Sequence, residues 1–201
     1  MMENENGIDK KAEKRKKILD AAVHTFARKG FYNTKIAEIA RDAGIADGTV
    51  YLYFKNKDAI LITIFEETVA KIIENIRETL SLKRTPQEKI REFVRLHLET
   101  VEANPDLAAV MMLELRQSNR FIKEYAGTGL LDYLAVIGEI IREGQEANCF
   151  RRDIEVGIAK RMLFGALDEI STLWVLLAEK KYDMQKSAEQ ISSLFLQGLK
   201  P

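Results

Sequence analysis

Residues 35–54 read KIAEIARDAGIADGTVYLYF, and this stretch decides the fold. Its first half has the i, i+3, i+4, i+7 apolar spacing of an amphipathic helix, which falls on Ile36, Ile39, Ala40 and Ala43. Gly44 then permits a tight turn, because glycine adopts backbone angles that other residues avoid. A second short helix over about 46–54 turns Val50 and Phe54 inward. Two short helices joined at a glycine predict a helix-turn-helix.

The outward face of the second helix is small and polar at its start. Asp47, Gly48 and Thr49 stand there, as a helix entering a major groove roughly 12 Å wide requires. Tyr51, Leu52 and Tyr53 are also expected to face outward, away from Val50 and Phe54. Core packing is an alternative for both tyrosines, and it is more plausible for Tyr51, whose ring would lie against the first helix.

Helical periodicity dominates the rest of the chain, so the predicted fold is all-α, with a three-helix head and a helical body. Thr34, Asn56, Asp153 and Asp183 are expected N-caps, and Pro86 and Pro105 open two helices. About nine helices are expected, over residues 10–28, 35–43, 46–54, 57–80, 85–103, 104–116, 119–147, 154–180 and 184–199.

Charge is divided unevenly between the two parts of the chain, although 31 Lys and Arg balance 31 Asp and Glu overall. Residues 10–57 hold 12 basic and 5 acidic side chains, whereas residues 58–201 hold 19 basic and 23 acidic. A basic head on an acidic body suggests a polyanionic partner for the head, although a solvated charge run would look the same.

Composition excludes several classes of protein. One cysteine, Cys149, rules out a disulfide framework within the chain, and His24 and His97 are too far apart for a local metal motif. The most apolar run, residues 163–178, is too short to span a membrane and carries two acids. We therefore expect a cytoplasmic protein that is not an enzyme, with no cofactor, no metal site and no membrane partner.

A longer string resembles the TetR family of bacterial repressors over about residues 11–70. It includes Gly30-Phe31, Thr34, Ala43-Gly44 and Lys57, and it contains the run Gly48-Thr49-Val50-Tyr51-Leu52-Tyr53-Phe54. The resemblance implies a DNA-binding head over 11–57, with the helix-turn-helix at 35–54. It also implies a helical effector-binding and dimerisation body over 58–201. Such a repressor binds a pseudo-palindromic operator in double-stranded DNA as a homodimer and is released by a small effector.

The resemblance assigns DNA contacts by position, with hydroxyls and backbone N–H groups holding phosphates. The expected DNA-binding residues are Lys35, Ala46, Asp47, Gly48, Thr49, Tyr51, Tyr53 and Lys57. The family often has serine where Ala46 stands, so Asp47 is the alternative cap for this helix. Whether Asp47 reads a base or only favours the helix N-terminus stays open. Lys14, Arg15 and Lys17 are expected to add salt-sensitive attraction.

The last two helices are more apolar than a monomer of this size explains, so a second subunit is expected to cover them. The alternative is ordinary burial within one chain. The expected dimer contacts are Met162, Leu173, Ile191, Leu194 and Phe195.

Two body strings, residues 113–119 and 162–169, are similar to the acyl-CoA-responsive branch of the family, the fatty-acid-degradation repressors. That similarity implies a hydrophobic effector, a long-chain acyl-CoA. The expected effector contacts are Met111, Leu115, Arg116, Leu130, Tyr133, Leu134, Ile137, Phe164, Leu167 and Trp174. Cations at the mouth of the site would hold the coenzyme A phosphates, with Arg77, Arg116, Arg120 and Lys123 as candidates.

Two other functions stay open. A multidrug-type repressor would sense planar or cationic aromatic compounds, and Asp168 and Glu169 beside Trp174 would suit it. A helical lipid-binding protein would have no role at DNA. The operator, the target genes, the effector's chain length and the number of dimers per operator do not follow from the sequence.

Overall fold

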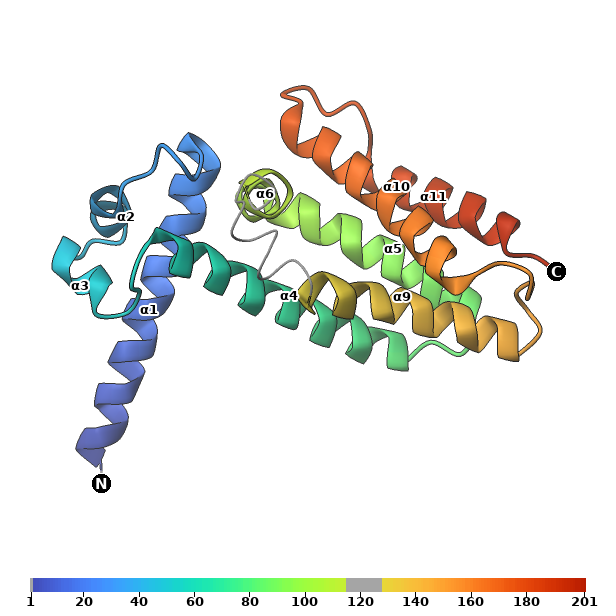
Figure 1. Ribbon diagram of the computed structural model, residues 1–201, viewed down its shortest axis with the longest axis horizontal. Helices are drawn as coiled ribbons and strands as arrows, with labels where there is room; N and C mark the ends of the chain where they lie inside the picture. The colour runs from blue at the N-terminus through green and yellow to red at the C-terminus, as the bar shows by residue number, and fades with distance from the viewer. Residues whose placement is uncertain (1, 115–127) are drawn as a thin grey trace.

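The computed structural model describes the backbone of residues 2–114 and 128–201 and the side chains of residues 10–113 and 129–201. Every regular element in these ranges is a helix, as predicted, and together they form a small head and a larger body (Figure 1). The head holds α1 (Met2–Lys29), α2 (Ile36–Asp42), α3 (Asp47–Tyr51) and the start of α4 (Lys57–Ser81). The body adds α5 (Pro86–Ala103), α6 (Pro105–Ala109), the π-helical turn η1 (Val110–Glu114), α9 (Thr128–Glu146), α10 (Val156–Leu176) and α11 (Met184–Gly198).

Three predicted helix starts are confirmed by side-chain caps. The Ala59 amide donates to Asn56 Oδ1 over 2.8 Å, and the Lys186 amide donates to Asp183 Oδ1 over 2.7 Å. Thr85 and Glu88 form a capping box ahead of Pro86, the first residue of α5. These caps satisfy N–H groups that have no partner within the helix, and so they fix where α4, α5 and α11 begin.

Two predicted caps are wrong. The Thr34 hydroxyl is buried and donates back to the Gly30 carbonyl over 2.8 Å, so it joins the loop to α1 instead of capping α2. Asp153 forms a salt bridge with Arg151, and α10 starts two residues later than expected, after Glu155. In both cases a nearer polar partner takes the side chain that the sequence pattern assigned to a helix end.

The head has its own core, and α4 belongs to it as much as α1 does. Ile18, Ala22 and Phe26 of α1 pack with Ile39 and Ala40 of α2, Val50 of α3 and Ile60, Leu61 and Ile64 of α4. Val110, from the distant turn η1, is fully buried in the same cluster. The head is therefore packed directly against one corner of the body.

The body core is formed by the inner faces of α4, α5, α9, α10 and α11, which lie side by side in Figure 1. Phe93, Ile137 and Leu163 are among its fully buried side chains. Residues of α4 belong to both cores. The helix has 25 residues and is about 37 Å long at the rise of an α-helix, so it links the head and the body mechanically. None of the described helices is both long and apolar enough to cross a membrane.

Candidate DNA-binding face and effector cavity

The turn between α2 and α3 has the geometry that the sequence requires. Gly44 has φ +67°, in the left-handed region, and the Ile45 amide donates to the Ala40 carbonyl over 3.0 Å. A Cβ at Gly44 would have free space around it, so the glycine is needed for its backbone angle alone. Val50, fully buried, then fixes α3 against the rest of the head.

The outer face of α3 is open to solvent, with Tyr51 57% exposed and Leu52 79% exposed. Ala46, Asp47 and Gly48 are also exposed, and Thr49 is half-buried. Core packing was considered more plausible for Tyr51 than for Tyr53, and the structure shows the opposite. Tyr53 packs against the head core, while Tyr51 projects outward. The short, open N-terminal end of α3 can approach a DNA groove, and Tyr51 at the end of α3 and Lys35 at the start of α2 are further exposed polar groups of the head.

Lys57 was predicted to contact phosphate, but its ammonium points into the head. It donates to the carbonyls of Tyr32, at 3.1 Å, and Thr34, at 2.9 Å, and also to that of Phe31, whose ring it overlies. Partial burial lowers the pKa of Lys57, and the neighbouring Asp58 carboxylate opposes that effect. The side chain therefore ties the start of α4 to the loop between α1 and α2.

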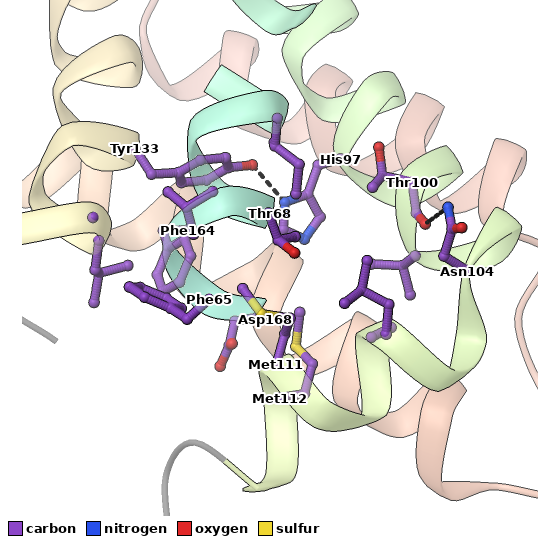
Figure 2. A pocket seen from close by; sticks show the side chains of 17 residues that line it. Phe65, Thr68, His97, Thr100, Asn104, Met111, Met112, Tyr133, Phe164 and Asp168 are labelled. Carbon is purple, nitrogen blue, oxygen red and sulfur yellow. Dashed lines mark hydrogen bonds between the residues drawn. The ribbon is translucent and has the colours of Figure 1, made fainter. Parts of the chain in front are cut away.

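A largely apolar cavity of about 240 Å³ lies in the body where α4, α5, α6, η1, α9 and α10 meet (Figure 2). Phe65, Val69, Met111, Leu130 and Phe164 form much of its wall. Gly129 lies close to Phe65 here, because a Cβ on it would be 2.9 Å from Phe65 Cε1 and the ring would have to shift. Thr68, Thr100 and Asn104 supply the polar groups on one side, and Asp168 stands on another (Figure 2).

His97 forms a polar cluster at the edge of this cavity. Its Nδ1 lies 2.6 Å from the Tyr133 hydroxyl, and its Nε2 lies 3.2 Å from Ser171 Oγ. Burial lowers the pKa of His97 to about 4, against the opposing effect of Asp168, and burial raises the pKa of Tyr133. Both groups are therefore neutral at pH 7, and the cavity wall there consists of uncharged hydrogen-bonding groups.

The cavity gathers only part of the predicted effector set. Met111, Leu130, Tyr133 and Phe164 line it. Leu134, Ile137 and Leu167 are buried in the body core behind the wall, and Trp174 packs at the edge of that core without lining the cavity. Leu115 and Arg116 lie outside the described residues, as do Arg120 and Lys123. Arg77, the remaining candidate for the coenzyme A phosphates, forms a bidentate ion pair with Glu139.

Sequence reasoning missed the wall contributed by α4 and α5. Phe65, Thr68, Val69 and His97 line the cavity, but none of them was among the expected effector contacts. One signal was available, since Thr68 and Thr100 are polar interruptions on otherwise apolar helix faces. The opposite walls are far apart in the sequence, so no local pattern pairs them.

The cavity and the head share residues. Phe65 and Val69 line the cavity and belong to the head core, and Leu107 and Met111 line the cavity while they pack against that core. On the outer surface, His24 Nδ1 of α1 lies 2.9 Å from Asp106 Oδ2 of α6. Any group that pushes α6 and η1 outward must therefore disturb the packing of the head.

A second apolar surface covers α10 and α11. Met162 is 65% exposed and Leu194 is 75% exposed, and Ile158 and Leu176 extend the α10 stripe. Leu173, Ile191 and Phe195, also predicted to be at a dimer interface, are half-buried beside them. Exposed apolar side chains gathered on two adjacent helices are typical of a protein–protein interface.

The helix-turn-helix head, the helical body and the largely apolar cavity together are the arrangement of a DNA-binding transcription regulator. The model of bacterial regulatory proteins of the tetR family matches residues 18–64, and the model of the YsiA-like protein C-terminal region matches residues 65–198. Together they span most of the chain, which therefore belongs to the TetR family.

Its relatives include regulators of fatty acid metabolism. The fatty acid metabolism regulator protein of Bacillus subtilis is 36% identical over 192 residues, which cover 96% of this chain and 98% of that protein. The crystal structure of FadR from Bacillus subtilis in complex with stearoyl-CoA has a TM-score of 0.85 at 36% identity, covering 91% of this chain and 98% of that one. FadR from Bacillus halodurans gives a TM-score of 0.87 at 36% identity, covering 92% and 96%.

Proposed function

We propose that this chain is a dimeric repressor that a long-chain acyl-CoA releases from its operator. The observation that carries the proposal is the apolar cavity whose wall is also part of the packing of the head. The fatty acid metabolism regulator of Bacillus subtilis is 36% identical to this chain, and the crystal structure of FadR from that organism holds stearoyl-CoA, which supports the same ligand class.

The cavity must expand to hold a long acyl chain. Its volume of about 240 Å³ is below the roughly 300–1,000 Å³ of typical small-molecule pockets. Met111 and Met112 stand on the side formed by η1, and methionine side chains adapt easily to a new neighbour. An acyl tail would therefore enlarge the cavity by displacing α6 and η1, the elements that pack against the head.

The energy available is sufficient for such a switch. About 14 buried methylenes at roughly 0.8 kcal/mol each supply about 11 kcal/mol before costs. Moving a two-state equilibrium from 1:99 to 99:1 takes about 5.5 kcal/mol of differential affinity. A tail that fits only one state of the body can therefore shift the head out of its DNA-binding position.

Dimerisation through α10 and α11 would present two heads to one duplex. The exposed side chains of Met162 and Leu194 are the central contacts, with Leu173, Ile191 and Phe195 around them. Two recognition helices held at a fixed separation read half-sites one helical turn apart, or a multiple of that distance. A displacement of α4 and α6 in each subunit changes that separation, and the operator no longer fits.

A duplex selected from a random-sequence pool allows a direct test by fluorescence anisotropy. Stearoyl-CoA is expected to weaken binding at least 100-fold, whereas coenzyme A alone has little effect because it lacks the tail. Thr68→Phe and Thr100→Phe, which fill the cavity, should retain DNA binding and lose the response. Thr79→Phe, on α4 outside the cavity, serves as the matched control. Unchanged affinity at saturating stearoyl-CoA would reject this effector.

The multidrug alternative draws on a single observation, the placement of Asp168 in the cavity wall. Glu169 is exposed and Trp174 does not line the cavity, so the other two residues expected to serve such a site are not part of the described wall. Release of the duplex by a cationic dye but not by stearoyl-CoA would favour this reading.

A further inference from the structure

The N-terminal half of α1 carries a basic surface of which only Arg15 contacts the head core, over the Phe54 ring. Six of the eight residues from 10 to 17 are Lys or Arg, and one is Glu. We call residues 10–17 the α1 arm. In Figure 1 this end of α1 runs past α2 and α3 as a projecting helix, on the side of the molecule opposite α10 and α11.

Helical periodicity places part of the arm on the face that holds the DNA-reading motif. Ala21 is buried, and Thr25 donates to Asp42 Oδ2 over 3.0 Å, so this face of α1 packs against α2. Lys17 and Lys14 stand four and seven residues before Ala21, and Lys10 stands one turn further. Residues at these spacings share a helix face, so the lysines prolong the α2-facing side of α1 beyond the head.

Half of the cations in the arm already have protein partners. Arg15 pairs with Glu67 of α4 at 2.5 Å and lies over the Phe54 ring, and Lys16 and Lys17 pair with Asp20 and Glu13. Lys10, Lys11 and Lys14 are exposed, and no ion pair forms on them within the described part of the chain. The basic run stops at Lys10, because positions 3, 5 and 9 are acidic.

We propose that the α1 arm binds the phosphate backbone of duplex DNA flanking the half-site that its own head reads. This inference rests on the proposed function. Because α10 and α11 lie on the opposite side, pairing through them directs the two arms away from the dimer axis and toward the outer ends of the operator (Figure 1). A row of free ammonium groups on a rigid helix matches the regular charge of a phosphate backbone and carries no base specificity.

Two duplexes and two variants test the proposal. The short duplex contains only the base pairs between the outer half-site edges of the selected operator, and the long duplex adds ten arbitrary base pairs at each end. The test variant is Lys10→Gln/Lys11→Gln/Lys14→Gln. The control, Lys71→Gln/Lys181→Gln/Lys200→Gln, removes the same charge from exposed positions outside the arm. Both variants should unfold at the wild-type temperature, since all six lysines are exposed.

The wild type and the control should bind the long duplex more tightly, and with a steeper salt dependence, than the short one. The test variant should bind both duplexes alike. Its slope of log K against log salt on the long duplex should be shallower by up to about 5, for six phosphate contacts per dimer. A test variant that keeps the wild-type preference for the long duplex would contradict the proposal that the α1 arm binds flanking DNA. If the wild type binds no duplex at low salt, the proposed function itself fails.

Discussion

Lys57 shows how the surroundings of a single side chain decide its role. Its sequence position favours a phosphate contact, but three carbonyl oxygens already accept from its ammonium. His97 shows the same effect, because burial beside Tyr133 and Ser171 turns a titratable side chain into a neutral part of the cavity wall.

For Lys57, substitution to methionine should cost stability more than DNA affinity. The change keeps most of the stem but leaves carbonyl oxygens of the loop without their donor, which should lower the free energy of unfolding by about 1–3 kcal/mol. Urea denaturation measures this loss, and Lys55→Met, at an exposed neighbour, is the control. A variant of wild-type stability with strongly weakened DNA binding would instead restore the phosphate-contact role.

His97 should make the protein less stable as pH falls from 7 to 5. Its pKa is about 4 in the folded state, below the ordinary value of 6.5, so over this range the unfolded chain binds a proton that the folded chain does not. The lost stability is about 2 kcal/mol between pH 7 and pH 5. Urea denaturation at several pH values should show this slope in the wild type and a reduced slope in His97→Gln. Equal slopes in the two proteins would contradict the assignment.

At the scale of elements, the turn η1 connects the cavity to the head. Val110 is fully buried in the head core, and the next residue, Met111, lines the cavity. Adjacent residues of a helical turn thus face two different interiors, so a shift on one side is transmitted to the other.

Val110→Ala should weaken that connection. Removing two buried methyl groups should cost about 1–3 kcal/mol of unfolding free energy and leave a gap between η1 and the head. We therefore expect stearoyl-CoA to bind, but to change DNA affinity by at least tenfold less than in the wild type. Isothermal titration calorimetry with the acyl-CoA and anisotropy with the duplex separate the two effects. Val175→Ala, half-buried in the body, should keep the full response.

At the scale of the whole molecule, the exposed apolar surface on α10 and α11 is the proposed dimer interface, which would determine how many heads meet one operator. Met162→Glu/Leu194→Glu places charge on this surface and should give a folded monomer in sedimentation velocity. The monomer should lose most of its operator affinity, because one head makes only half of the contacts. Leu82→Glu, at another exposed leucine, should remain dimeric. A double variant that stays dimeric would exclude this surface as the interface.

The sequence by itself determined the all-helical fold, the helix-turn-helix at 35–54, the caps at Asn56 and Asp183 and the start of α5 at Pro86, because each depends on residues within about one turn of one another. Only the tertiary structure decided which side chains line the cavity and what Lys57 and His97 contact. The cavity wall joins residues from 65 to 168, and the partners of Lys57 lie more than 20 positions away. Such contacts depend on how whole helices pack, which local spacing does not encode.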